Sequence, residues 1–204
     1  MQKKASLRKD FGIVLFGGSF DPIHNGHLQI ASAVLDTYPV EQVIFIPCQQ
    51  SPLKGDQTVT SPEDRLKMLS LAIESEARYT LDALEIDRGG TSFTSDTVHI
   101  YRERYPEQRL YWILGEDQFN NLCQWNAIEY LIKELTFLVY PRENEPVLSS
   151  ISEVHGITYE QISGPKLKIS STQVRELCES SKTIKGLVPK TVEAFIHSKN
   201  LYKI

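Results

Sequence analysis

The chain has 204 residues, of which 41% are hydrophobic and 24% charged, and its formal net charge at pH 7 is -4. A chain of this length is expected to form one domain that buries about 70% of the surface its unfolded form exposes. The acidic balance argues against a general nucleic-acid-binding protein, whose domain is usually basic. No apolar run approaches the roughly 18 residues of a membrane span, so we expect no membrane partner.

The first ten residues, MQKKASLRKD, are basic, but the apolar run behind them is too short for the core of a signal peptide. We interpret residues 1–9 as a flexible tail and residues 10–204 as one domain. Cys48, Cys123 and Cys178 form no C-x-x-C pair and lie in or beside apolar segments, which indicates reduced and buried thiols. These features predict a cytoplasmic protein, and no feature of the sequence indicates an oligomeric state.

Short apolar runs alternate with helical patterns along the chain. Strands are predicted at residues 11–16, 42–47, 109–114, 135–140 and 157–162. The first four runs are almost unbroken and rich in β-branched and aromatic residues, as expected for strands buried on both faces of a parallel sheet. Helices are predicted from apolar residues at three- and four-residue spacing and from capping residues such as Ser61 and Ser170. These helices cover or begin at residues 28–38, 61–64, 94–105, 125–132, 170–178 and 189–196.

Strands that alternate with helices imply right-handed βαβ units. The expected fold is therefore α/β: a Rossmann-like doubly wound parallel sheet in a single domain with a C-terminal helical segment. Ligands of such sheets bind beyond the carboxyl ends of the strands. The glycine turn after residues 11–16 and the turn at residues 115–117 both follow strands, so we expect them to face one crevice. Residues 141–156 are predicted to be a surface loop, and the polar loop 48–60 is expected to close during turnover.

The stretch FGGSFDPIHNGH, residues 16–27, joins a glycine pair, an Asp-Pro turn and two histidines three residues apart. A zinc site is disfavoured, because a catalytic one needs three protein ligands and no further Cys or His follows at ligand spacing. Ser19 lies in no G-x-S-x-G elbow, so a nucleophile triad is disfavoured too. Two interpretations stay open. Either His24 and His27 only cap and pack the first helix, or the glycine pair, the helix N-terminus and the imidazoles together bind phosphate.

Several motifs resemble those of one family. GGSFDPIHNGH resembles the first motif of the H-x-G-H nucleotidylyltransferase superfamily, and ISSTQVR (169–175) is similar to its closing ISST-x-x-R. SFTSDTV (92–98) and GEDQFNNLCQW (115–125) are similar to two segments of the bacterial nicotinate-mononucleotide adenylyltransferases, [SP]-[YF]-T-x-x-T-[LV] and G-x-D-x-x-x-x-x-x-x-W. The closing GLVPKTVEAFIHSKNLY (186–202) looks like the usual end of that family. The resemblance runs from about residue 11 to 202.

The resemblance implies a reaction. ATP would transfer its adenylyl group to nicotinate mononucleotide, giving nicotinate adenine dinucleotide and pyrophosphate in NAD biosynthesis. Mg²⁺ is implied as the cofactor, bound mainly through the ATP phosphates and water rather than by a protein cage. The attacking phosphate is already ionised at neutral pH, so no general base is required. The protein has to hold two anions in line and stabilise the charge that develops on the phosphates.

The resemblance also implies roles for single residues. His24 and His27 would contact the ATP phosphates and stabilise the transition state, while Lys54 and Arg175 would add positive charge. The implied ATP-binding residues are Gly17, Gly18, Ser19, Phe20, His24, His27, Ile169, Ser171, Thr172 and Arg175. In the mononucleotide site, Thr94 would lie near the carboxylate, Asp117 on the ribose and Trp125 on the pyridine ring.

Some alternatives remain beside these roles. On spacing alone, Trp125 would be a core residue and Arg175 a solvated surface charge. Thr94 and Thr97 would be helix-entry caps, and Asp117 would cap the segment after residues 109–114. The family commonly reads P-P-H-K where this chain reads Ser51-Pro52-Leu53-Lys54, and a leucine cannot donate a hydrogen bond to a phosphate. The alternative functions are a sister adenylyltransferase that prefers nicotinamide mononucleotide and a catalytically weak nucleotide-binding module. Residues 94–125 argue against phosphopantetheine or cytidylyl transfer.

Overall fold

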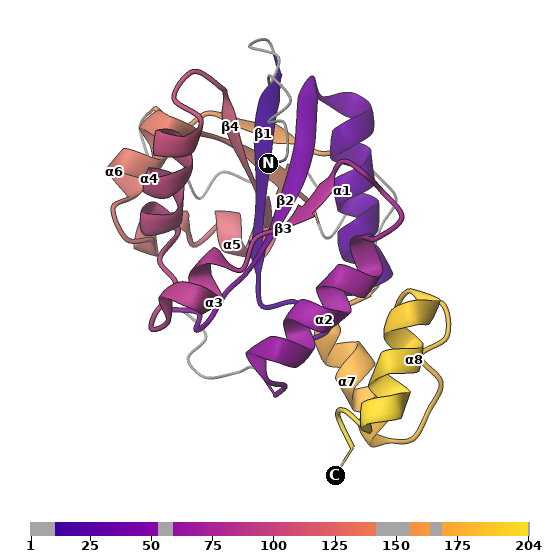
Figure 1. Cartoon of the computed structure of the whole chain (residues 1–204). Helices are drawn as coiled ribbons and strands as arrows, with labels where there is room; N and C mark the ends of the chain where they lie inside the picture. The colour runs from indigo at the N-terminus through magenta and orange to yellow at the C-terminus, as the bar shows by residue number, and fades with distance from the viewer. Residues whose placement is uncertain (1–10, 53–58, 142–155, 164–168, 204) are drawn as a thin grey trace, which may run out of the picture.

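A parallel sheet with the strand order β3-β2-β1-β4-β5-β6 organises the chain in the computed structural model (Figure 1). The structure describes residues 11–52, 59–141, 156–163 and 169–203. The strands of this part are β1 (Gly12–Gly18), β2 (Val40–Pro47), β3 (Tyr79–Leu81), β4 (Leu110–Gly115), β5 (Leu135–Tyr140) and β6 (Tyr159–Gln161). The chain builds the sheet outward from β1 in one direction and then from β4 in the other. The predicted doubly wound α/β fold is confirmed.

Helices cover both faces of the sheet, because successive residues of a buried strand point to opposite sides. Their bounds are α1 (Asn25–Thr37), α2 (Pro62–Ile73), α3 (Leu84–Arg88), α4 (Thr94–Arg104), α5 (Glu116–Phe119), the 3₁₀ turn η1 (Leu122–Gln124), α6 (Ile128–Glu134), α7 (Ser171–Glu179) and α8 (Lys190–Lys199). Val14 and Phe16 of β1 pack in one core with α1, α2, α7 and α8. Ile13 and Leu15 pack in the other core with α4, α5 and α6. Figure 1 shows these two groups of helices on opposite sides of the sheet.

Local capping explains where several helices begin. The Ser61 side chain accepts a hydrogen bond from Asp64 N at 3.1 Å, and Pro62 occupies the first turn of α2. The Ser170 side chain accepts one from Gln173 N at 3.1 Å at the start of α7. Both caps confirm what the sequence predicts. Among the described residues, no helix combines the length and the apolar character that crossing a membrane requires.

Two predictions are wrong. Trp125 does not start a helix, because Ala127 has a left-handed backbone (φ 51°) that separates η1 from α6. Cys48 and Cys178 are buried as expected, but Cys123 is exposed. Cys123 lies in η1, where Leu122 takes the buried position, and consecutive residues of so tight a turn point in different directions. The sequence also gave no signal for the short elements β3 and α3.

Candidate active site

Two adjoining cavities lie beyond the carboxyl ends of β1, β2 and β4, where the strand order reverses. The larger, of about 400 Å³, is lined by the β1–α1 turn, the turn after β4 and the first turn of α7. The smaller, of about 290 Å³, is lined by residues 92–94 and 124–126. The residues that line both cavities are Gly17, Gly18, Ser19, Cys48, Ser51 and Gln118. The cavities therefore form one crevice, and the prediction that the two turns face a common crevice is confirmed.

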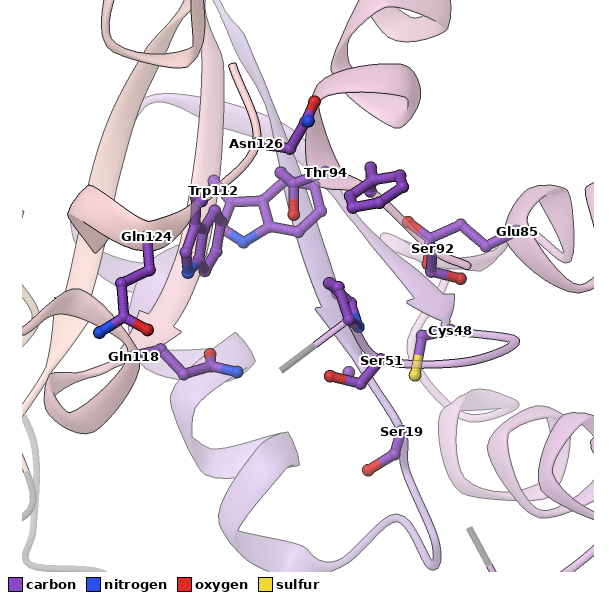
Figure 2. Close-up of a pocket in the computed structure, with 15 residues that line it drawn as sticks. Ser19, Cys48, Ser51, Glu85, Ser92, Thr94, Trp112, Gln118, Gln124 and Asn126 are labelled. Atoms are coloured by element: carbon purple, nitrogen blue, oxygen red, sulfur yellow. The ribbon is translucent and has the colours of Figure 1, made fainter. Parts of the chain in front are cut away.

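Polar groups gather where the two cavities meet. Figure 2 shows the hydroxyls of Ser19 and Ser51 and the amide of Gln118 at one end of the smaller cavity, with Thr94 and Trp112 at the other. A molecule that reaches from one cavity into the other has to pass this junction. The residues of the junction thus face both cavities.

His24 and His27 form a reciprocal cap at the start of α1. The backbone N–H of His27 donates to Nδ1 of His24 at 3.3 Å, and the backbone N–H of His24 donates to Nδ1 of His27 at 3.2 Å. The two rings stack with centroids 3.6 Å apart and an interplanar angle of 17°. Because each Nδ1 accepts a hydrogen bond, each neutral ring carries its proton on Nε2. The pair therefore offers two Nε2–H donors that the cap does not use.

Both imidazoles are held neutral. Burial lowers the pKa of His24 to about 4, although its backbone hydrogen bond acts in the opposite direction. Burial also lowers the pKa of His27 well below its usual value, and the neighbouring His24 adds to this effect. The His27 ring lies edge-on to Phe16 and Phe20, with centroids 5.8 Å and 5.1 Å away. At neutral pH the free site thus contains uncharged hydrogen-bond donors rather than imidazolium ions.

The first turn of α7 is joined directly to the β1–α1 turn. Ser171 Oγ donates to the carbonyl of Pro22 at 2.9 Å, and Arg175 Nη1 donates to the carbonyl of Asp21 at 2.7 Å. Arg175 Nη2 also donates to Thr172 Oγ1 at 3.2 Å. These bonds bring residues about 150 positions apart in the sequence to one wall of the larger cavity. The guanidinium of Arg175 thereby lies in the same cavity as the two imidazoles.

The smaller cavity combines aromatic rings with a helix N-terminus. The Trp125 and Trp112 rings are perpendicular, with centroids 6.4 Å apart, and the buried Nε1 of Trp125 has no hydrogen-bond partner among the described residues. Thr94 begins α4 beside the cavity, and its preceding residue Phe93 provides no side-chain cap. This end of α4 therefore keeps its positive dipole toward the cavity.

A buried carboxyl lies in the wall of the smaller cavity. Glu85 is 4% exposed, and burial raises the pKa of its carboxyl group. Thr97 Oγ1 donates to Glu85 Oε1 at 2.6 Å. Thr97 therefore binds this carboxyl rather than the end of α4, and the structure does not support the alternative in which the threonines cap that helix.

The glycine pair leaves room for aromatic side chains. A Cβ on Gly17 would lie 2.5 Å from Cζ2 of Trp112, and one on Gly18 would lie 3.2 Å from Cζ of Phe20. Trp112 lines the smaller cavity and Phe20 the larger. The missing side chains thus let both rings lie against the strand end that forms the junction of the two cavities.

A buried arginine holds two strand ends together. Arg65 is 0% exposed, and its Nη1 donates to the carbonyls of Ser19 (2.9 Å) and Cys48 (2.7 Å). Its Nε and Nη2 have no hydrogen-bond partner among the described residues. Arg65 was not among the predicted site residues, although its spacing contains a signal. Arg65 occupies the first position of the buried stripe of α2, which continues through Met68, Leu69, Ala72 and Ile73.

The structure gathers most of the expected site residues. Around the larger cavity lie Gly17, Gly18, Ser19, Phe20, His24, His27, Asp117, Ile169, Ser171, Thr172 and Arg175. Thr94 and Trp125 line the smaller cavity, whereas Asp117 does not. Lys54 and Leu53 lie outside the described residues. Our reading of the sequence missed Gln118, Gln124 and Asn126, although the first two lie within the motif GEDQFNNLCQW, and it missed Glu85 because α3 was not predicted.

Comparison with known sequences identifies relatives of this chain. The family described as cytidylyltransferase-like matches residues 15–177. A probable nicotinate-nucleotide adenylyltransferase of Opitutus terrae is 34% identical over 191 residues, which is 94% of this chain and 97% of that protein. A protein of the same name from Geobacillus thermodenitrificans is 35% identical over 190 residues, covering 93% of this chain and 85% of that one.

A solved structure has the same fold. It is the nicotinic acid mononucleotide adenylyltransferase of Plasmodium falciparum complexed with NaAD, with a TM-score of 0.80 and 24% sequence identity. The match covers 94% of this chain and 97% of that chain. At this level of identity the likeness supports the shared α/β architecture.

Proposed function

The chain belongs to the cytidylyltransferase-like family, and on that premise we propose that it transfers the adenylyl group of ATP to nicotinate mononucleotide. The products are nicotinate adenine dinucleotide and pyrophosphate, so the chain is a nucleotidyltransferase of NAD biosynthesis. One observation supports this reaction above all others. The imidazole pair and the first turn of α7 line one cavity, an aromatic pocket with a helix N-terminus forms the next, and the two share a junction.

ATP occupies the larger cavity in this proposal. Ile169 and the start of α7 border the adenosine part, and Arg175 faces the outer phosphates. The Nε2–H groups of His24 and His27 donate to the phosphates, where negative charge increases as the bond to pyrophosphate breaks. Neutral donors suit this role, because they stabilise the growing charge without becoming proton donors to the substrate. The phosphate of the mononucleotide is already ionised. At the junction of the cavities it attacks the α-phosphorus of ATP, in line with the departing pyrophosphate.

The pyridine ring occupies the smaller cavity, packed on Trp125. The uncapped N-terminus of α4 at Phe93 and Thr94 provides a positive dipole end for the carboxylate of the ring. A neutral amide gains less from this field. The arrangement therefore favours nicotinate over nicotinamide mononucleotide.

We also propose that Mg²⁺ enters with ATP. Within the part of the chain that the structure describes, no group of three or more His, Cys, Asp and Glu side chains is placed to hold a metal ion. The imidazoles use Nδ1 for the cap, which leaves Nε2–H donors rather than ligands. This donor set suits Mg²⁺ that is held by triphosphate oxygens and water and neutralises the triphosphate. Cys48, Cys123 and Cys178 form no disulfide, which suits a cytoplasmic reaction.

A pyrophosphate-release assay tests the proposed function. Purified protein is given ATP and Mg²⁺ with nicotinate mononucleotide, with nicotinamide mononucleotide or with no acceptor. We expect release with nicotinate mononucleotide at a kcat/KM roughly tenfold above that for the amide, as about 1.4 kcal/mol from a partly buried helix N-terminus gives. A higher kcat/KM for the amide would identify the sister enzyme. If ATP binds but neither acceptor gives pyrophosphate release, the protein is a nucleotide-binding module instead.

A further inference from the structure

Asp21 makes a set of hydrogen bonds that the roles assigned to the motif residues do not explain. It is 1% exposed, and its carboxylate accepts three hydrogen bonds from segments that are distant in sequence. Val59 N donates to Oδ2 at 2.6 Å, Thr60 Oγ1 to Oδ1 at 2.5 Å, and Tyr202 Oη to Oδ1 at 2.7 Å. One carboxylate thus joins the β1–α1 turn to the residues before α2 and to the segment after α8.

The backbone of the same turn is bound by the late part of the chain. Arg175 and Ser171 donate to the carbonyls of Asp21 and Pro22. Asn25 N donates to the carbonyl of Leu187 at 2.8 Å. His24 lies between these attachment points and caps α1 through Nδ1, so the position of its Nε2–H depends on the position of the turn.

We infer that Asp21 is a positioning residue for the nucleotide-binding turn, and that the hydroxyls of Tyr202 and Thr60 hold its carboxylate in place. This inference rests on the proposed function for the binding of ATP at this turn and for its readout of turnover. A shift of the turn displaces the imidazole donors and the carbonyl that binds Arg175, and His24, His27 and Arg175 line the larger cavity. Thr94 and Trp125 lie on other elements, so we expect a smaller effect on the mononucleotide side.

A matched pair of variants separates positioning from stability. Tyr202→Phe removes one donor from Asp21 and leaves two. Tyr101→Phe makes the same change at Asp82, whose carboxylate accepts bonds from Tyr101 Oη (2.6 Å), Leu84 N (2.9 Å) and Arg104 Nη1 (2.7 Å). Both tyrosines are buried, at 8% and 1% exposure. Neither Tyr101 nor Asp82 lines either cavity.

We expect Tyr202→Phe to lower kcat about tenfold, because a displacement of catalytic groups by even a fraction of an ångström is costly. Its Kd for ATP, measured by calorimetry, should rise several-fold, while the KM for nicotinate mononucleotide stays within about twofold of wild type. Both variants should lower the midpoint of thermal unfolding by similar amounts, because each removes one hydrogen bond from a carboxylate. Tyr101→Phe should leave kcat, the Kd for ATP and the KM for nicotinate mononucleotide within about twofold of wild type.

The inference is overturned if Tyr202→Phe loses stability like Tyr101→Phe but keeps wild-type kcat and ATP affinity. If Tyr202→Phe does not fold, Thr60→Val decides, because it removes the other hydroxyl from the same carboxylate oxygen. An ATP defect in that variant supports the inference, and wild-type ATP binding overturns it. If the wild-type protein binds ATP but forms no pyrophosphate, the proposed function fails, while the calorimetric comparison still tests the role of Asp21.

Discussion

The two imidazoles of the β1–α1 turn show how one side chain serves the fold and the chemistry with different atoms. Nδ1 of each ring accepts a backbone N–H and caps α1, while Nε2–H remains available to a ligand. The two interpretations that the sequence leaves open, a cap or a phosphate site, are therefore compatible. Capping is shown by the structure, and phosphate binding remains a prediction. The cap also selects the tautomer that makes Nε2 a donor.

His24→Asn tests the chemical role without removing the cap. Asparagine is among the favoured N-cap residues but carries no donor at the position of Nε2. We expect kcat to fall about a hundred- to thousandfold, the loss typical of one transition-state donor. The free energy of unfolding should change little, whereas His24→Ala should lower both kcat and stability, the latter by about 1 kcal/mol. Wild-type turnover in His24→Asn would remove His24 from the chemistry.

The lowered histidine pKa values predict how stability depends on pH. The pKa of His24 is lowered by burial to about 4 in the folded protein from its ordinary value of 6.5, which applies to the unfolded chain, so only the unfolded state takes up a proton between these two pH values. Stability from this group is fully present above pH 6.5 and falls by roughly 3 kcal/mol by pH 4, with a further loss from His27 in the same direction. Urea unfolding of the nucleotide-free protein from pH 4 to 8 measures this loss in the free energy of unfolding. His24→Asn should show a shallower decline, and an identical decline would contradict the assignment to His24.

At the level of elements, the site is built where strand and helix ends are packed unusually closely. Gly17, next to the last residue of β1, lies against the Trp112 ring of β4, and Arg65 of α2 binds the carbonyls that follow β1 and β2. The start of α4 keeps its backbone N–H groups free of a side-chain cap. Strand ends, a buried cation and a helix terminus thus help to place polar groups around the crevice.

Gly17→Ala tests the contact between β1 and β4. Because its Cβ would meet Trp112 at 2.5 Å, we expect a loss of about 1–3 kcal/mol in the free energy of unfolding and a higher KM for the mononucleotide. Gly18→Ala is the comparison, since its Cβ would lie 3.2 Å from Phe20 and requires a smaller adjustment. Equal free energies of unfolding for the two variants would show that the Trp112 ring can move away from the new Cβ without an extra loss of stability.

At the scale of the whole molecule, the crevice exists because the C-terminal part of the chain packs against the β1–α1 turn near the N-terminus. The segment 169–203 places α7 and α8 in the same core as α1 and α2, with α8 beside α2, and the start of α7 meets the β1–α1 turn (Figure 1). The turn after β4 closes the crevice from the other side of the switch point. Residues from the first, middle and last parts of the sequence thus line one cavity.

Chelation tests how the metal ion takes part. EDTA should stop pyrophosphate release and reduce the stabilisation that ATP gives, which is about 2.7 kcal/mol when free ATP is a hundred times its Kd. The midpoint of thermal unfolding of the nucleotide-free protein should not change, because Mg²⁺ is expected to bind with ATP rather than to the free protein. Added Mg²⁺ should restore turnover. A lower midpoint in EDTA without nucleotide would reveal a metal site in the protein itself.

The sequence alone determined the features that depend on short-range physics. Unbroken apolar runs and three- to four-residue spacing predicted β1, β2, β4 and β5 and most of the long helices, because burial imposes these periods on local stretches of chain. Ser61 and Ser170 predicted helix starts because a cap contacts residues only three positions away. The paired motifs around residues 16–27 and 169–175 predicted a nucleotide site through their resemblance to the H-x-G-H nucleotidylyltransferases, while residue types alone left a helix cap and a phosphate site open at residues 16–27.

Only the tertiary structure decided which groups meet and in what state. It placed Tyr202 on Asp21 and Arg65 under two strand ends, and it put Asp117 in the larger cavity rather than beside Trp125. These relations depend on the packing of elements far apart in the chain, and no local pattern encodes such distances. The neutral state of the imidazoles has the same origin, because burial is a property of the folded whole rather than of the histidines themselves.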